Sequence, residues 1–345
     1  MKKSLLAIAI AAAVPAVASA QVTVFGIMDG GFNSVTTKTA SEVTVNQTGG
    51  NAAGALASNR LGFRGTEKIG DLTAGFHYEL GMDAGGTGNL AVGMISNATG
   101  AATAVPSQGV RQSTVSLSGG FGTIQIGRDY TPIFSLSAAT DTSMADNVNI
   151  GKSVYLNGAA AVTTVRNSGQ IMYISPAMGG IVARVHFADR SKDPHATDDV
   201  GSIGGSLRYD AGPLMLGVGI NTQKTWTSAT ATTKREEMII GGTYMVNKQL
   251  SIQAQHGDLK TNGAGTYKGT QVGARFNVSP TLMAHVSGGS GDGTVGDFTA
   301  YKFGLINSLS KRTRLYALYG QDELKKAGTP TRERSEFAIG INHAF

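Results

Sequence analysis

The chain ends in a segment, 337–345, in which a large side chain stands at every second position and small or polar residues fill the gaps. A period of two is that of a β-strand, so this segment predicts a terminal strand with one apolar face. The strand ends on an aromatic residue, Phe345, with no loop after it. Such a strand suits the closure of a sheet in a bilayer, where an edge cannot stay unpaired and aromatic residues mark the interface. An amphipathic strand of a soluble β protein is the alternative.

The first twenty residues have the layout of a cleaved secretory signal peptide. Two lysines precede an apolar run, Leu5–Val14, and small residues follow it. That run is shorter than the about 20 apolar residues that a spanning helix needs. We therefore predict that residues 1–20 are a signal peptide cleaved before Gln21, and that 21–345 is one mature domain.

Composition narrows the class of protein further. Glycine accounts for 48 of 345 residues, about twice the average, which disfavours a helical fold. The chain has no cysteine, so disulfides and thiolate chemistry are excluded. Loss of Lys2 and Lys3 with the signal leaves 27 basic against 23 acidic residues, a net charge of +4 that does not indicate a nucleic-acid partner.

The period of two recurs along the mature chain, as the patterning of apolar residues shows in 72–80, 181–187, 203–209, 214–220, 272–276 and 315–319. Short turns rich in Gly, Pro, Asn, Asp or Ser are predicted near 68–71, 118–121, 176–180, 210–213, 246–249, 278–281 and 308–311. Long polar connections are predicted at 37–57, 84–109, 132–164, 190–200, 222–235, 258–268, 288–298 and 321–332.

Seven turns and eight long connections separate sixteen strands. An even count, with long and short connections in alternation, is typical of an all-β, antiparallel transmembrane β-barrel of the outer membrane. The second face of most strands carries Gly, Ser, Thr, Gln, Arg, His or Lys, and a barrel of this size is too wide for side chains to fill. We therefore expect a water-filled centre. A soluble sandwich has the opposite arrangement, which periodicity alone does not exclude.

One block, Asn59–Glu67, reads Asn-Arg-Leu-Gly-Phe-Arg-Gly-Thr-Glu, and with 21–26, 122–132 and 166–176 it resembles the general porins of Gram-negative bacteria, of the beta-proteobacterial type. The resemblance extends from Gln21 to the end of the chain. It implies a homotrimer of sixteen-stranded barrels, each narrowed by an inward-folded third long loop. It also implies passive diffusion of small hydrophilic solutes and ions.

In that family, arginines on the barrel wall face acidic residues of the third loop across the narrowest point. The positions that the resemblance assigns to constriction and lumen are Arg60, Arg64, Arg111, Arg166 and Glu79 on the wall, and Asp141, Asp146 and Lys152 on the loop. Two departures leave the selectivity open. Ile27 stands where related porins can carry a basic residue, and the third loop lacks a strongly acidic cluster.

Two arginines do not fit the lumen by parity. Arg111 is in phase with the apolar residues Val115 and Leu117, which either a β-bulge or a wall that contacts another subunit explains. Arg128 is in phase with two isoleucines, so we assign it to a possible trimer contact. Phe345 is assigned as the assembly signal.

Fixed positive charge in a narrow channel enriches anions, and arginine stays charged in almost any surroundings. A weak anion preference is therefore the leading hypothesis. The alternative is that each arginine is an ordinary solvated residue of the lumen lining with no individual effect. A channel specific for carboxylates or phosphate, and a barrel that serves as an adhesin or structural anchor, remain open.

No enzyme, cofactor or metal is predicted. The pattern at Gly291–Gly296 has the letters of a dinucleotide-binding motif but lies between two predicted strands, where no helix can receive phosphate. The six histidines have no spacing that pairs them as metal ligands. The charged segment 189–199 is either ordinarily solvated or in contact with bridging cations or lipopolysaccharide.

Overall fold

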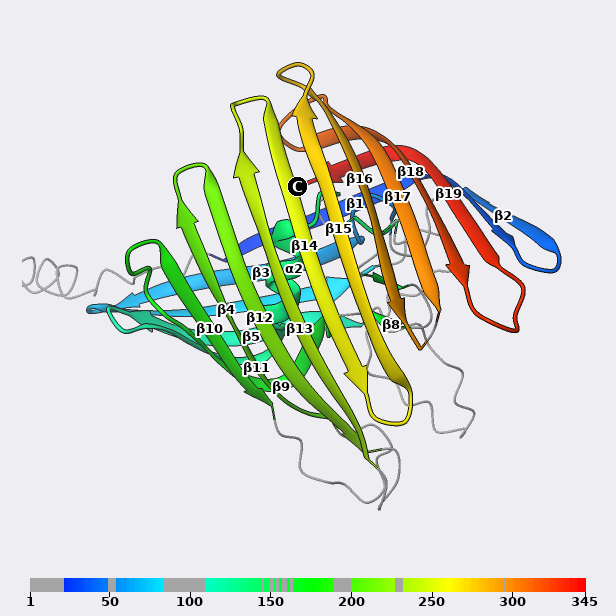
Figure 1. Ribbon diagram of the computed structural model, residues 1–345. Helices are drawn as coiled ribbons and strands as arrows, with labels where there is room; N and C mark the ends of the chain where they lie inside the picture. The colour runs from blue at the N-terminus through cyan, green and yellow to red at the C-terminus, as the bar shows by residue number, and fades with distance from the viewer. Residues whose placement is uncertain are drawn as a thin grey trace, which may run out of the picture.

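The computed structural model describes residues 22–48, 54–82, 109–143, 146–148, 152, 155–156, 160–161, 164–188, 200–226, 232–294 and 296–345, and the predicted signal peptide lies outside them. Sixteen strands in this part of the chain pair antiparallel in chain order around a closed barrel (Figure 1). They are β1 (Thr23–Lys38), β3 (Arg60–Ile69), β4 (Leu72–Gly81), β5 (Val110–Gly119), β6 (Gly122–Tyr130), β9 (Arg166–Ile174), β10 (Ile181–Ala188), β11 (Val200–Ala211), β12 (Leu214–Trp226), β13 (Thr232–Met245), β14 (Leu250–Thr261), β15 (Gly265–Asn277), β16 (Leu282–Gly293), β17 (Asp297–Ser308), β18 (Thr313–Lys325) and β19 (Arg332–Ala344).

The barrel closes where the last strand meets the first. β19 pairs with β1 from Ile27 opposite Ala344 to Lys38 opposite Glu333. The N-terminal part of β1 pairs with β3. The prediction of a sixteen-stranded antiparallel barrel is therefore confirmed, and so are all seven short turns.

The strands have one apolar and one polar face, as β17 illustrates. Tyr301 and Phe303 point outward and are 49% and 44% exposed, whereas Ala300 and Lys302, which alternate with them, are buried. Exposed apolar side chains on the outer surface and buried polar side chains on the inner surface are the reverse of a soluble core. This pattern is what a barrel in lipid requires. No helix among the described residues is long and apolar enough to cross a membrane.

At the end of the barrel opposite the short turns, several connections differ in length from the prediction. β14 and β15 are joined by 262–264 only, where 258–268 was predicted, and β16 and β17 by 294–296. The region 37–57, predicted to be a loop, contains β2 (Glu42–Thr48), which pairs with β1. The physical reason is that backbone hydrogen bonds extend a hairpin without apolar side chains, so polar strand ends continue beyond the apolar band.

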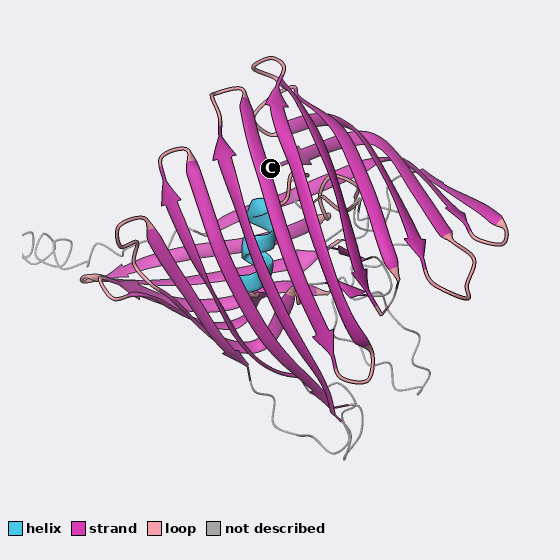
Figure 2. Ribbon diagram, in the orientation of Figure 1, coloured by secondary structure: helices cyan, strands magenta, loops and turns pink. Residues whose placement is uncertain are grey.

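The third connection, between β6 and β9, contains α2 (Pro132–Thr140) and two short paired strands, β7 (Tyr155–Leu156) and β8 (Ala160–Ala161). The hydroxyl of Thr131 caps α2 by accepting from the amide of Phe134 at 3.2 Å. α2 lies against β11 to β14 of the barrel wall (Figure 2). Two glycines make room for it.

A Cβ atom on Gly217 would lie 2.3 Å from Leu136, and one on Gly241 would lie 2.7 Å from the hydroxyl of Thr140. The helix therefore needs glycine at both wall positions. The inward fold of the third loop as a whole stays a prediction, because part of 141–163 lies outside the described residues.

Candidate functional site

A β-bulge brings Arg111 to the inner face of the barrel. In the pairing of β4 with β5, Glu79 lies opposite Gln112 and Leu80 lies opposite Val110, so Arg111 is an extra residue without a partner across the ladder. The bulge reverses the side on which Arg111 would otherwise point. Its Nε then donates to Oε1 of Glu79 at 2.5 Å. Strand parity left two explanations open, a β-bulge and a contact with another subunit, and the register supports the β-bulge.

Three arginines converge on one carboxylate and one phenol. Nη2 of Arg111 and Nη2 of Arg166 both donate to the hydroxyl of Tyr130, at 3.0 and 2.7 Å. The Arg166 guanidinium also lies 4.3 Å from the centre of the Tyr130 ring. Nη1 of Arg60 is 3.5 Å from Glu79 Oε1. We call these five residues the arginine cluster: Arg60, Arg111, Arg166, Glu79 and Tyr130.

The cluster is held by its surroundings on the wall. Nε of Arg60 donates to the carbonyl of Ser58 at 2.9 Å. The ring of Tyr130, the last residue of β6, stacks on Phe134 of α2 with centres 5.0 Å apart. Sequence reasoning missed Tyr130. Its place directly before the proline-containing start of a helix was the available signal.

The electrostatic balance of the arginine cluster is positive. Three guanidinium groups face one carboxylate, which leaves two positive charges, and arginine does not lose its proton under any ordinary condition. The side chains of Arg60 and Arg111 are 18% and 10% exposed. Partial burial reduces screening by water, so the field at the cluster favours an anion.

Arg64 does not belong to the cluster. It shares a strand and a face with Arg60 but lies four residues away, about 13 Å along the strand. Its guanidinium lies 5.2 Å from the centre of the Phe25 ring. It lines a polar cavity of about 410 Å³ together with His77 and Asp129.

Arg128 bridges two neighbouring strands. Its Nε donates to the carbonyl of Val110 at 2.7 Å and its Nη1 to the hydroxyl of Ser168 at 2.7 Å. The isoleucines in phase with it, Ile124 and Ile126, are exposed on the outer surface. The trimer contact assigned to Arg128 stays a prediction.

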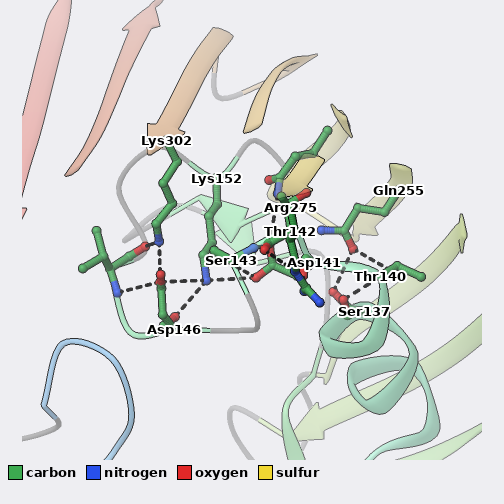
Figure 3. A network of polar contacts seen from close by, with 12 residues as sticks. Ser137, Thr140, Asp141, Thr142, Ser143, Asp146, Lys152, Gln255, Arg275 and Lys302 are labelled. Atoms are coloured by element: carbon green, nitrogen blue, oxygen red, sulfur yellow. Dashed lines mark hydrogen bonds and ion pairs between the residues drawn. The ribbon is translucent and has the colours of Figure 1, made fainter. Parts of the chain in front are cut away.

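The third loop is bonded to the barrel wall by a buried ionic network (Figure 3). Nζ of Lys152 lies 3.1 Å from Asp141 and 3.4 Å from Asp146, all three in the loop. Lys302, on β17 of the wall, forms an ion pair with Asp146, and both side chains are fully buried. On β15, Arg275 donates to the backbone carbonyl of Asp141 and, at 2.7 Å, to that of Thr142.

Asp141 and Asp146, the two acidic residues predicted to face the arginines, both take part in these contacts. Gln271 of β15 also donates to Asp141, at 3.1 Å. Burial raises the pKa of Asp141, but the ammonium groups of Lys152 and Lys302 and hydrogen bonds from Ser143 outweigh burial and hold that pKa below its usual range. Asp141 and Asp146 thus form ion pairs with lysines. Sequence reasoning missed Lys302, although it is the one charged residue on the inner face of its strand.

The first connection is also bonded to the wall. Asp29 of β1 accepts from the hydroxyl of Tyr316 at 2.7 Å and from the amide of Ala57 at 3.0 Å. Asn147 of the third loop donates to the carbonyl of Gly54 at 2.7 Å. Described segments of the first and third connections therefore contact each other.

Phe345 completes the seam between the two ends of the chain. Its backbone amide donates to the carbonyl of Gly26 and its carbonyl accepts from the amide of Gly26, both at 3.1 Å. The ring packs over Gly26, where a Cβ would lie 2.3 Å from it.

Comparison with known proteins identifies the family. The family model of the Gram-negative porins matches residues 6–327. The chain belongs to the Gram-negative porin family. Among relatives of this porin, an outer membrane porin protein 32 from Delftia acidovorans is 32% identical and an outer membrane porin protein from Bordetella pertussis is 27% identical, with all of each chain covered. These relatives agree with the beta-proteobacterial type that the sequence resembles.

The fold of this porin is also that of solved porins. An anion-selective porin from Comamonas acidovorans matches it with a TM-score of 0.73 and 27% identity, over 95% of this chain and 100% of that one. The porin is therefore a channel-forming β-barrel protein of the Gram-negative outer membrane. In the part of the chain that the structure describes, no group of three or more His, Asp or Glu residues is arranged to hold a metal ion.

Proposed function

We propose that this porin forms a water-filled diffusion channel for small hydrophilic solutes and ions, with a weak preference for anions set by the arginine cluster. The single observation that carries the proposal is the convergence of Arg60, Arg111 and Arg166 around Glu79 and Tyr130 on the inner wall. The anion selectivity of the Comamonas acidovorans porin supports the same sign of preference.

Within this proposal the loop and the wall have separate roles. The arginine cluster supplies the positive charge, and the third loop narrows the channel on the side where α2 packs. Asp141, Asp146 and Lys152 hold the loop in place through Lys302 and Arg275. Arg64 lines the lumen on the same strand as Arg60 and adds a smaller contribution.

The test is the reversal potential of the reconstituted protein in a KCl gradient. We expect the double variant Arg60→Gln, Arg111→Gln to move the potential toward cations, and Arg64→Gln to move it less. Lys325→Gln is the matched control, because Lys325 lies on the outer side of β18 and is exposed. An unchanged potential in the double variant removes the cluster from the selectivity role.

A channel specific for carboxylates or phosphate is the second candidate. The observation that favours it is the pair of arginines that bond to one phenol, since two guanidinium groups can bind one anionic group. Liposome swelling with sugars of graded size separates the two. A smooth size limit supports the diffusion channel, and saturable uptake of one anion supports the specific one. Absence of conductance in planar bilayers would instead favour an adhesin or structural anchor.

The proposal includes the partners and the route to the membrane. Residues 1–20 act as the cleaved signal peptide. The mature chain assembles as a homotrimer, with Arg128 near the subunit contact. Lipopolysaccharide surrounds the outer half of the barrel. Stepwise closure in groups of three in single-channel recordings tests the trimer.

A further inference from the structure

A cavity of about 180 Å³ lies on the inner wall, next to the short turn that joins β17 to β18. Apolar side chains form one side of it, namely Ile27, Leu56, Ala57 and Ala344. Polar side chains form the other side, namely Lys311, Arg312, Arg314 and Asn342. Because the short turns of outer-membrane barrels face the periplasm, we call this cavity the exit pocket.

The apolar side of the exit pocket adjoins the arginine cluster. Ile27 of β1 lies directly opposite Arg60 of β3 and, on its other side, opposite Ala344 of β19. Ile27 is two residues from Asp29, which is 1% exposed on the inner face, so the side chain of Ile27 stands on that face as well. Cα atoms of directly opposite residues are about 5 Å apart. An anion at the cluster therefore has an apolar surface beside it.

The cationic side chains of the exit pocket have no bonded partner. Lys311 and Arg312 belong to the turn before β18, and Arg314 is the second residue of that strand. All three residues are exposed. Their side chains form no hydrogen bond and no ion pair in the part of the chain that the structure describes. Each of these cations is therefore available to an anion in the pocket.

Two negative charges lie near these three cations. The carboxylate of Asp29 accepts from Nδ2 of Asn342 at 2.9 Å, and also from the hydroxyl of Tyr316 at 2.7 Å and the amide of Ala57 at 3.0 Å. It is buried and already bonded on several sides. The carboxylate of Phe345 is the second negative charge. The balance is +1, so the field at the mouth of the pocket favours an anion.

The exit pocket suits an ion with one charged end and one apolar end. Chloride or phosphate would leave the apolar side without a contact, and a sugar would bury hydroxyl groups against Ile27 and Leu56 without partners. A carboxylate bound to Arg314 instead places an alkyl chain against these two side chains and removes apolar surface from water. Since a water molecule occupies about 30 Å³ in the liquid, the cavity has room for roughly six non-hydrogen atoms.

We propose that the exit pocket is a binding site for monocarboxylates with a short alkyl tail, of about four carbons. Arg314 binds the carboxylate, and the tail packs on Ile27, Leu56 and Ala57. Ile27 is thus a specificity-determining residue, at the position where related porins can carry a basic one. The site rests on the proposed water-filled channel, but it is independent of the charge selectivity set by the arginine cluster.

The test is inhibition of the chloride conductance of the reconstituted porin, at fixed KCl and pH 7, by pentanoate. Glycerate is the comparison, because it has the same charge and the same number of non-hydrogen atoms but carries hydroxyl groups in place of the alkyl tail. We expect pentanoate to halve the conductance at a concentration roughly tenfold lower than glycerate, as burial of about two methylene groups predicts. Equal potency of the two anions in wild type would overturn the site.

Substitutions then assign the two ends of the ligand. Ile27→Ser should weaken inhibition by pentanoate about three- to tenfold and leave inhibition by glycerate unchanged, whereas Ile27→Leu should behave as wild type. Val35→Ser is the matched control, because Val35 lies on the same strand and the same inner face, eight residues away. Arg314→Gln should weaken inhibition by both anions. An unchanged response in Ile27→Ser, or an equal loss in Val35→Ser, would contradict the proposal.

The reversal potential in a KCl gradient separates this site from the proposed anion preference. It should be the same in wild type and Ile27→Ser. A wild-type channel that prefers cations would contradict the role of the arginine cluster, while a tenfold difference between pentanoate and glycerate would still support the exit pocket. An anion-preferring channel that both compounds inhibit equally would contradict the exit pocket alone.

Discussion

Arg111 donates from Nε to Oε1 of Glu79 at 2.5 Å, although strand parity places its side chain on the lipid face. The bulge in β5 resolves the conflict. It adds a third guanidinium to a wall that already carries Arg60 and Arg166. Because Glu79 is the only carboxylate among the five residues of the arginine cluster, it limits the positive charge there.

Glu79→Gln should therefore increase the preference for anions. Removal of one negative charge is expected to raise the chloride-to-potassium permeability ratio roughly two- to fivefold, equivalent to about 0.4 to 1 kcal/mol. The measurement is the reversal potential in a KCl gradient. Glu67→Gln, on an exposed position of the same hairpin, is the control. A shift toward cations would contradict the assigned charge balance.

Lys302→Met should loosen the third loop. The variant leaves Asp146 buried with Lys152 alone, at 3.4 Å. Loss of one partner from a buried ion pair costs about 3 kcal/mol or more when the remaining charge is unpaired, and less here because Lys152 remains. We expect more frequent brief closures and greater open-channel noise in single-channel recordings. The double variant Lys302→Met, Asp146→Leu removes both buried charges, and its open-channel noise should be closer to that of wild type. Noise equal to that of wild type in the single variant would show that the ion pair does not hold the loop.

The loop should stay attached in moderate acid. Burial raises the pKa of Asp141, but Lys152, Lys302 and Ser143 favour the charged form more strongly, so the pKa is depressed in the folded protein. A depressed pKa contributes stability above the unfolded value of about 4 and loses it only as the pH falls through the lower folded value. Open-channel noise should therefore be unchanged from pH 7 to pH 4. Asp141→Asn should be noisy at both values, and a rise in wild-type noise near pH 5 would count against the depressed pKa.

Phe345→Ala should slow assembly. The backbone hydrogen bonds to Gly26 can remain, but the ring that packs over this glycine is lost. We expect a smaller folded fraction after a fixed time in lipid vesicles, measured by heat-modifiable mobility on gels. Phe345→Tyr keeps an aromatic ring and is the control. Equal folding rates for all three proteins would remove the terminal ring from the assembly role.

Strand number, strand order and the two faces were determined by the sequence itself. The period of two is a property of neighbouring residues, and the glycine and proline turns mark where each hairpin reverses. Resemblance to the porins then pointed to Arg60 and Glu79. Hairpin length was less well determined, because the polar residues of 258–268 and 288–298 are compatible with loops as well as with strand ends.

What only the tertiary structure decided is which charges meet. The bulge at Arg111 depends on the register between two strands, so no pattern within β5 reveals it. Lys302 and Asp146 are separated by 156 residues and are paired only because the third loop packs on β17. Tyr130 joins the cluster because α2 holds its ring. Local periodicity defines the face on which a side chain stands, whereas its charge partner is defined by contacts between residues far apart in the chain.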